Sequence, residues 1–172
     1  MTTLDRFGTD RLEAVALHAD DLDELHSMHQ DPRVMATLGG VRTHERTQQF
    51  LKTNLEHWNQ YGFGLWTFRT EDGAFVGRGG LRHVRVGGCD EVELAYALRP
   101  EAWGKGLATE MARAILAIGF GTLRLHEVVA FTLATNRQSV RVMEKVGCVF
   151  ERELVHKGLP HVLYRQKRAE SI

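Results

Sequence analysis

The segment from Glu91 to Glu110 constrains the fold more than any other part of the chain. Its first part, Glu91–Leu98, has the apolar pattern of a strand, and an apolar helical face follows from about Ala108 to Phe120. The turn between them contains Gly104 and Gly106. A strand that enters a helix through such a turn leaves free backbone N–H groups at the positive end of the helix dipole. The segment therefore predicts a site for a phosphate, with a plain strand-to-helix turn as the alternative.

Other phosphate and catalytic motifs do not fit the chain. No stretch has the Gly-x-x-x-x-Gly-Lys-Ser/Thr pattern of a P-loop, and Thr109 stands where a dinucleotide-binding turn needs its third glycine. His126-Glu127 lacks the second histidine of a zinc protease helix, and no Gly-x-Ser-x-Gly elbow occurs. These absences exclude four common classes of site from the sequence.

Composition predicts one folded domain over residues 1–172. The chain is 43% hydrophobic, and its 22 basic and 22 acidic residues balance, which argues against a nucleic-acid partner. Residues 1–100 have 11 basic and 15 acidic side chains, whereas residues 101–172 have 11 and 7. We therefore expect an anionic ligand at the second part and a cationic one at the first. Two cysteines, no secretory leader and no membrane-spanning run favour the cytoplasm.

The remaining elements alternate between hairpins and helices. Helices are expected after Asp20-Asp21, from Thr43 to a stop before Tyr61-Gly62, and over Ser139–Val146 with Gly147 as the stop. The expected strands are Arg11–Leu17, Phe63–Arg69, Ala74–Val84, Glu127–Ala134 and a hairpin over Cys148–Arg165. Glycines 77, 79 and 80 indicate either a bulge or close backbone approach within a strand. This order predicts a mixed sheet of the α+β or α/β class.

The chain contains two motifs, Trp103-Gly104-Lys105-Gly106-Leu107-Ala108-Thr109-Glu110 and the later stretch from Asn136 to Gly147. These motifs and their spacing resemble the GNAT superfamily of acetyl-CoA-dependent N-acetyltransferases. Within the superfamily, the chain is similar to the subgroup that acetylates ribosomal-protein N-termini. The resemblance extends upstream through Asp31–Met35, Tyr61–Trp66 and Val76–Leu81, so it covers most of the chain.

The resemblance implies a fold and a cofactor site. The fold is the acyl-CoA N-acyltransferase fold, whose mixed, mostly antiparallel sheet has splayed central strands flanked by helices. The pantetheine arm of acetyl-CoA is expected along a strand formed by Leu94, Ala95, Tyr96, Ala97 and Leu98. The phosphates are expected at Trp103, Gly104, Lys105, Gly106, Leu107, Ala108 and Thr109, with Lys145 as a further cation. Trp103 departs from the usual Gln or Arg of the superfamily pattern.

The second motif supplies Asn136 and Ser139. Asn136 is expected to bond a pantetheine amide, and Ser139 to protonate the departing thiolate, although both are also common turn and cap residues. Many superfamily members have a tyrosine acid where this chain has Met143, which has no proton to donate. The proton must then come from Ser139, a water or another tyrosine, and Tyr164 is one candidate.

The first candidate for the general base is Glu93, at the start of the central strand. A partly buried carboxylate could take the amine proton directly or through a water, and a solvent-facing strand residue is the plain alternative. Glu91 and His83 are the other candidates.

The expected activity is acetyl transfer to a primary amine in a ternary complex, without an acyl-enzyme or a metal. A protein N-terminal amine is the first expectation for the acceptor, and a small-molecule amine remains open. The alternatives are a catalytically silent acyl-CoA-binding or sensory domain and an unrelated phosphate-binding fold. No membrane partner is expected, and the chain is either a monomer or a homodimer.

Overall fold

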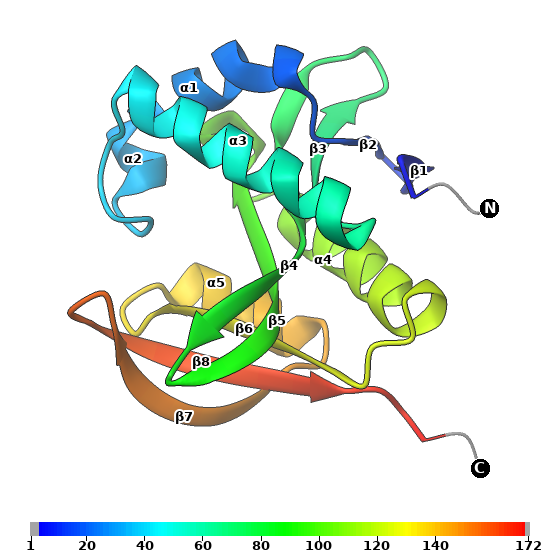
Figure 1. The fold of residues 1–172 in the computed structure, drawn as a ribbon, viewed down its shortest axis with the longest axis vertical. Coiled ribbons are helices and arrows are strands. Elements are labelled where there is room, and N and C mark those ends of the chain that lie inside the picture. The colour runs from blue at the N-terminus through cyan, green and yellow to red at the C-terminus, as the bar shows by residue number, and fades with distance from the viewer. Residues whose placement is uncertain (1–3, 171–172) are drawn as a thin grey trace.

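A computed structural model describes residues 4–170, which contain an eight-stranded sheet of order β1-β2-β3-β4-β5-β6-β8-β7 (Figure 1). The strands are β1 (Arg6–Gly8), β2 (Leu12–Ala16), β3 (Leu65–Thr70), β4 (Phe75–Val86), β5 (Cys89–Leu98), β6 (Glu127–Leu133), β7 (Val149–His156) and β8 (Leu159–Lys167). Neighbouring strands are antiparallel except β5 and β6, which are parallel. The expected mixed, mostly antiparallel sheet is confirmed.

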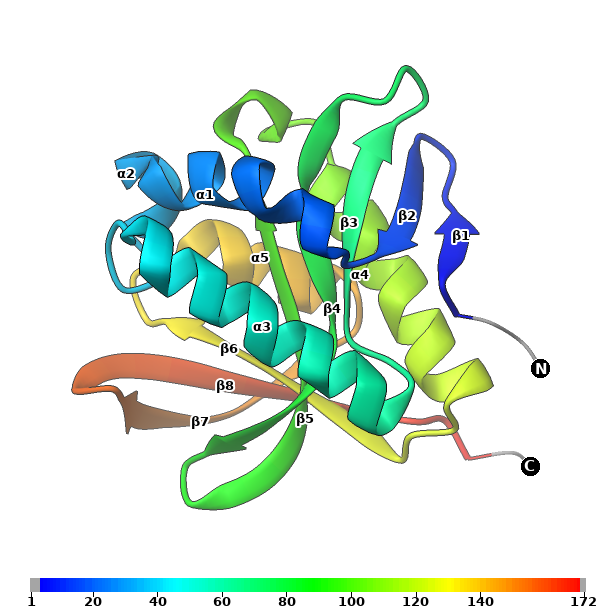
Figure 2. The same cartoon turned by 45° about the horizontal axis from the view of Figure 1, so that its top comes forward.

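Helices cover both faces of the sheet. The first three, α1 (Leu22–Gln30), α2 (Pro32–Met35) and α3 (His44–Tyr61), lie on one face, and α4 (Leu107–Ala117) and α5 (Arg137–Lys145) lie on the other (Figures 1 and 2). Short helical turns η1 (Ala19–Asp21), η2 (Pro100–Ala102) and η3 (Ile118–Thr122, a π-helical turn) complete the set. Within residues 4–170, no helix is both long and apolar enough to span a bilayer.

The ends of α3 follow directly from the sequence. The Thr43 side chain accepts a hydrogen bond from the backbone N–H of Arg46, and Gly62 ends the helix at a φ of 73°. The helix expected after Asp20-Asp21 is present as α1, but the expected side-chain cap from Asp21 is absent. Asp21 precedes α1 without a side-chain cap bond, because its carboxylate accepts from the backbone N–H of His18 in the preceding turn.

Two glycines of β4 lie where the backbone of a neighbouring strand leaves no room for a Cβ atom. A Cβ at Gly77 would collide with the carbonyl oxygen of Ala97, and one at Gly80 would collide with that of Gly64. The expected close approach of neighbouring strands is therefore confirmed at both positions. It lets β4 pair closely with β3 and β5 at the centre of the sheet.

Side chains of β5 alternate between two hydrophobic clusters. Leu94, Tyr96 and Leu98 pack with α4 and α5, whereas Ala95 and Ala97 pack on the side of α1 to α3. The first face of β5 is therefore built from large side chains. The second face carries only methyl groups after Glu93.

The centre of the sheet is open between β5 and β6. These parallel strands share a single register pair, Glu93 with Val129, and then diverge (Figures 1 and 2). The splayed central strands that the resemblance implies are therefore present. One edge of β5 beyond Glu93 is left without a strand partner in the described part of the chain.

Candidate functional site

The glycine turn opens onto the start of α4. Gly104 and Gly106 have φ angles of 71° and 75°, a left-handed conformation that favours glycine. No side chain caps the helix that begins at Leu107. A Cβ at Gly104 would meet nothing within 4 Å. The turn thus presents unhindered backbone amides at a positive helix end, which suits a phosphate.

Arg11 reaches this turn from the loop between β1 and β2. Its Nη1 donates to the carbonyl oxygen of Lys105 at 2.8 Å, and its Nε pairs with Glu110 at 2.7 Å. Thr9 also donates to Glu110, at 2.9 Å. Sequence reasoning missed Arg11, because 94 residues separate it from Lys105 and only the fold brings them together.

The remaining residues of the turn differ in exposure. Lys105 is exposed, whereas Leu107 and Thr109 are buried and Ala108 is half-buried. The Trp103 indole N–H donates to the carbonyl oxygen of Leu98 at 3.0 Å and so occupies the end of β5. That carbonyl is already bonded, which leaves fewer free backbone groups on Leu94–Leu98 for a ligand.

Asn136 and Ser139 form the start of α5. The Asn136 carboxamide oxygen accepts from the Ser139 backbone N–H at 3.3 Å, and its Nδ2 donates to Thr132 at 3.0 Å. The capping function that competes with ligand binding is therefore present at Asn136. Lys145 is exposed in the last turn of the same helix.

The hydroxyl of Tyr96 lies 2.8 Å from Ser139 Oγ and also donates to the Ser139 carbonyl oxygen at 3.2 Å. Burial raises the pKa of Tyr96 to about 12, so its hydroxyl keeps its proton at neutral pH. Met143 is buried nearby in the same cluster and cannot donate. Tyr164 instead donates to Glu144 at 3.3 Å.

Glu93 is buried beside an arginine. Only 5% of the residue is exposed, and Oε1 lies 2.5 Å from Arg82 Nε. The solvent-facing alternative for this residue is therefore wrong. Glu91 is bound by Arg165 at 2.8 Å, and the exposed His83 packs against Tyr61 with ring centroids 4.2 Å apart.

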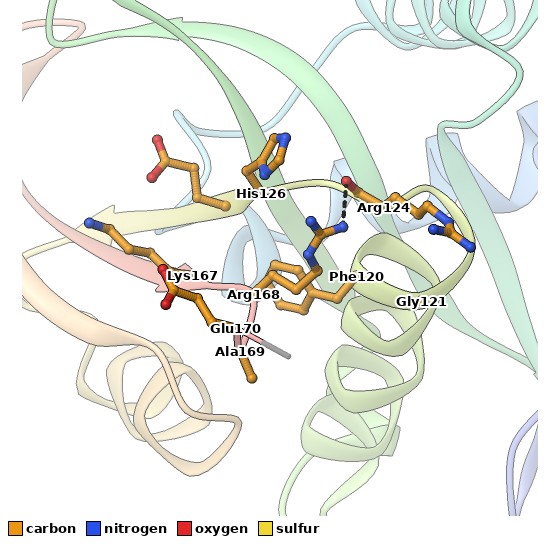
Figure 3. A pocket seen from close by; sticks show the side chains of 9 residues that line it. Phe120, Gly121, Arg124, His126, Lys167, Arg168, Ala169 and Glu170 are labelled. Atoms are coloured by element: carbon orange, nitrogen blue, oxygen red, sulfur yellow. Dashed lines mark hydrogen bonds between the residues drawn. The ribbon is translucent and has the colours of Figure 1, made fainter. Parts of the chain in front are cut away.

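A surface cavity of about 830 Å³ lies elsewhere, at the far end of α4 (Figure 3). It is lined by Phe120, Gly121, Arg124, His126, Glu127, Lys167, Arg168, Ala169 and Glu170. Arg168 crosses it and donates to the carbonyl oxygen of Arg124 at 3.0 Å. None of the expected site residues lines this cavity. Among residues 4–170, no group of three His, Cys, Asp or Glu side chains is placed to hold a metal ion.

Comparison with known proteins gives three kinds of match. The acetyltransferase (GNAT) domain matches residues 11–149. The uncharacterised protein YkkB of Bacillus subtilis is 27% identical over 97% of this chain and 98% of its own length. The spermidine N(1)-acetyltransferase of Escherichia coli is 32% identical over 42% of this chain and 39% of its own. The crystal structure of an acetyltransferase from Agrobacterium tumefaciens matches with a TM-score of 0.84, 24% identity, and coverage of 98% and 97%.

Proposed function

The chain belongs to the GNAT family of acetyl-CoA-dependent N-acetyltransferases, and from that premise we propose that it acetylates a primary amine by direct transfer within a ternary complex. The observation that carries the proposal is the single register pair between β5 and β6. An extended pantetheine arm can lie against a free strand edge, since its amides match the spacing of backbone groups.

The cofactor site of this proposal runs from that edge to the start of α4. Its contacts are Leu94, Ala95, Tyr96, Ala97, Leu98, Asn136 and Ser139 for the arm, and Trp103 through Thr109 with Lys145 for the phosphates. The open geometry of Gly104 and Gly106 supports the phosphate end. Arg11 adds a guanidinium beside Gly106, whose Cβ would lie 3.6 Å from Arg11 Nη2.

Glu93 is the proposed general base. It takes a proton from the ammonium form of the acceptor, and the freed nitrogen lone pair attacks the thioester carbonyl carbon. Arg82 bonds Oε1, while Oε2 makes no hydrogen bond with any residue from 4 to 170. One carboxylate oxygen therefore remains for the amine or for an intervening water.

Tyr96 and Ser139 complete the transfer at the sulfur. As the carbon–sulfur bond breaks, the electron pair stays on sulfur, the nitrogen releases its second proton to water, and the thiolate takes a proton from Ser139 Oγ. The Tyr96 hydroxyl, 2.8 Å away, replaces the Ser139 proton and regains its own from water. The raised pKa of Tyr96 keeps this hydroxyl protonated at neutral pH, so a proton is present beside Ser139 when the thiolate forms.

The proposal is tested by single-turnover incubation with acetyl-CoA and a broad panel of amines, followed by thiol release and mass spectrometry. We expect equal amounts of free thiol and of acetylated amine. Stoichiometric binding of acetyl-CoA with no transfer to any amine would overturn the catalytic proposal and favour a silent acyl-CoA-binding domain. The panel includes peptides with free N-termini, because the acceptor could be a protein N-terminus or a small molecule.

A further inference from the structure

Two buried polar atoms lack hydrogen-bond partners among residues 4–170, and they lie at the same place. They are Nε2 of His29 and Nε of Arg78. The His29 ring packs edge-on against Phe50, with centroids 5.0 Å apart, and the Arg78 guanidinium lies 4.8 Å from the centroid of the same ring. Buried polar groups are almost always hydrogen-bonded, so two such atoms without partners beside one ring make this a candidate position for a polar ligand.

Positive charge is concentrated around Phe50. Besides Arg78, the guanidinium carbons of Arg42 and Arg82 lie 5.0 Å and 5.9 Å from the ring centroid. We call Arg42, Arg78, Arg82 and His29 the Phe50 cluster. Of its three arginines, only Arg82 forms a salt bridge with any of the residues the structure describes, and its partner is Glu93.

The buried charge of Arg78 lowers the stability of the protein without ligand. The residue is only 3% exposed, and burial together with Arg82 and Arg42 lowers its pKa to about 9. The Arg78 side chain makes no hydrogen bond or salt bridge within residues 4–170, and the charge of Glu93 and the ring of Phe50 offset its desolvation penalty only in part, since its pKa stays lowered. A bound carboxylate would offset this penalty by its negative charge and would accept hydrogen bonds from the free N–H groups of Arg78.

The cluster shares its face of the sheet with the proposed base. Arg82 is paired in register with Glu93, and Arg78 is paired with Ala97. Directly opposed residues of antiparallel strands point to the same side. Ala95 and Ala97 add only methyl groups to that side, next to the open edge of β5. An acceptor bound there would have Glu93 at one end and the free guanidinium groups at the other.

We propose that the Phe50 cluster binds a carboxylate of the acceptor, so that the preferred acceptor is a small primary amine with a carboxylate, as in an amino acid. This inference rests on the proposed acetyl transfer. It adds a carboxylate to the cationic ligand expected at the first part of the chain, because the fold collects three arginines of that part on this face. Three guanidiniums disfavour a polyamine such as spermidine.

The first test compares the common α-amino acids with their own α-carboxamides, which keep the amine and lose only the carboxylate. We expect kcat/KM to be about 10- to 100-fold higher for the best amino acid than for its amide. The Arg78→Met variant should remove most of that ratio. Arg85→Met, an exposed position on the same strand, should keep it. Equal rates for acid and amide, or a preference for spermidine, would overturn the inference while leaving amine acetylation intact.

The second test needs no turnover. The melting temperature of the free Arg78→Met variant should exceed that of the wild type, because an uncompensated buried charge is lost. Sodium acetate, compared with sodium chloride at equal ionic strength, should raise the melting temperature of the wild type but not of the variant. A destabilised Arg78→Met protein, or an equal response of both proteins to acetate, would show that Arg78 has a structural role and would overturn the inference. Loss of all acetyl transfer with an intact acetate response would instead count against the proposed function alone.

Discussion

The Tyr96 hydroxyl on β5 lies 2.8 Å from the Ser139 hydroxyl on α5, which links the two motifs across the open centre of the sheet. If this pair protonates the thiolate, Tyr96→Phe should lower kcat about 10²-fold and leave KM for acetyl-CoA nearly unchanged. Steady-state kinetics check this. Tyr164→Phe removes another largely buried hydroxyl, one bonded to Glu144, and should keep full kcat. A loss confined to KM would remove Tyr96 from proton transfer.

Glu93→Gln should lower kcat by about 10² to 10⁴-fold, because an amide cannot take the amine proton. Acetyl-CoA binding, measured by calorimetry, should be retained. The exposed Glu153 on β7 gives a matched control, and its Gln variant should behave as wild type. A variant at Glu93 with an unchanged rate and pH profile would mean that the base lies elsewhere.

Gly106→Ala should weaken acetyl-CoA binding about tenfold, equivalent to roughly 1.4 kcal/mol, by placing a methyl group beside the phosphate turn. Its backbone strain should also cost about 1 kcal/mol of stability, since φ is 75°. Gly88→Ala has the same kind of strain at a φ of 79°, in the turn between β4 and β5, at the opposite end of β5 from the phosphate turn. The Gly88 variant should therefore lose stability but keep its affinity, and equal affinity in both variants would contradict a phosphate site.

Stability should rise between pH 3 and 6.5 because of His29. Burial lowers the pKa of His29 to about 3, and Arg78, Arg42 and His26 act in the same direction. The unfolded chain therefore binds a proton in this range that the folded chain does not, so unfolding becomes easier as the pH falls. The contribution is on the order of 4 kcal/mol. Urea unfolding of His29→Gln should show a shallower pH dependence, and an identical slope would refute the assignment.

One thiol per folded chain should react with iodoacetamide at neutral pH. Cys89 is exposed, whereas Cys148 is buried, and burial raises the pKa of Cys148 to about 11. The thiolate is the reactive form, so Cys148 should be labelled only after unfolding. Mass spectrometry of peptides distinguishes the two. Rapid labelling of Cys148 in the folded protein would make an acyl-enzyme route through this thiol worth testing.

Local signals predicted the elements whose ends depend on local chemistry. Thr43 and Gly62 mark the two ends of α3, because a hydroxyl cap and a left-handed glycine act within a few residues. Two short elements were not predicted: β1 has three residues, too few for a period, and α2 begins directly at Pro32 after the end of α1. Their stability depends on pairing with β2 and on packing against α1, which no local pattern encodes.

Some features of the candidate site could likewise be predicted from local sequence, whereas others depend on the tertiary fold. Spacing within one turn predicted free backbone amides around Gly104 and Gly106, and the structure adds that both glycines are left-handed. The Tyr96–Ser139 contact joins residues 43 apart in sequence and needed the tertiary fold. A guanidinium at Arg78, within an apolar and glycine-rich strand, was a visible signal, since such a strand has little use for a charge unless something binds it.

The single register pair at Glu93 and Val129 also divides the hydrogen-bond lattice of the protein. Strands β1 to β5 form one ladder and β6 to β8 another, and side-chain packing beneath α4 and α5 holds the two together. The backbone amides along this seam therefore have less protection from a neighbouring strand than those on the side of β5 that pairs with β4. A molecule bound along the seam would hydrogen-bond to the free edge of β5 as an added strand does. It would thereby connect the two ladders of the sheet.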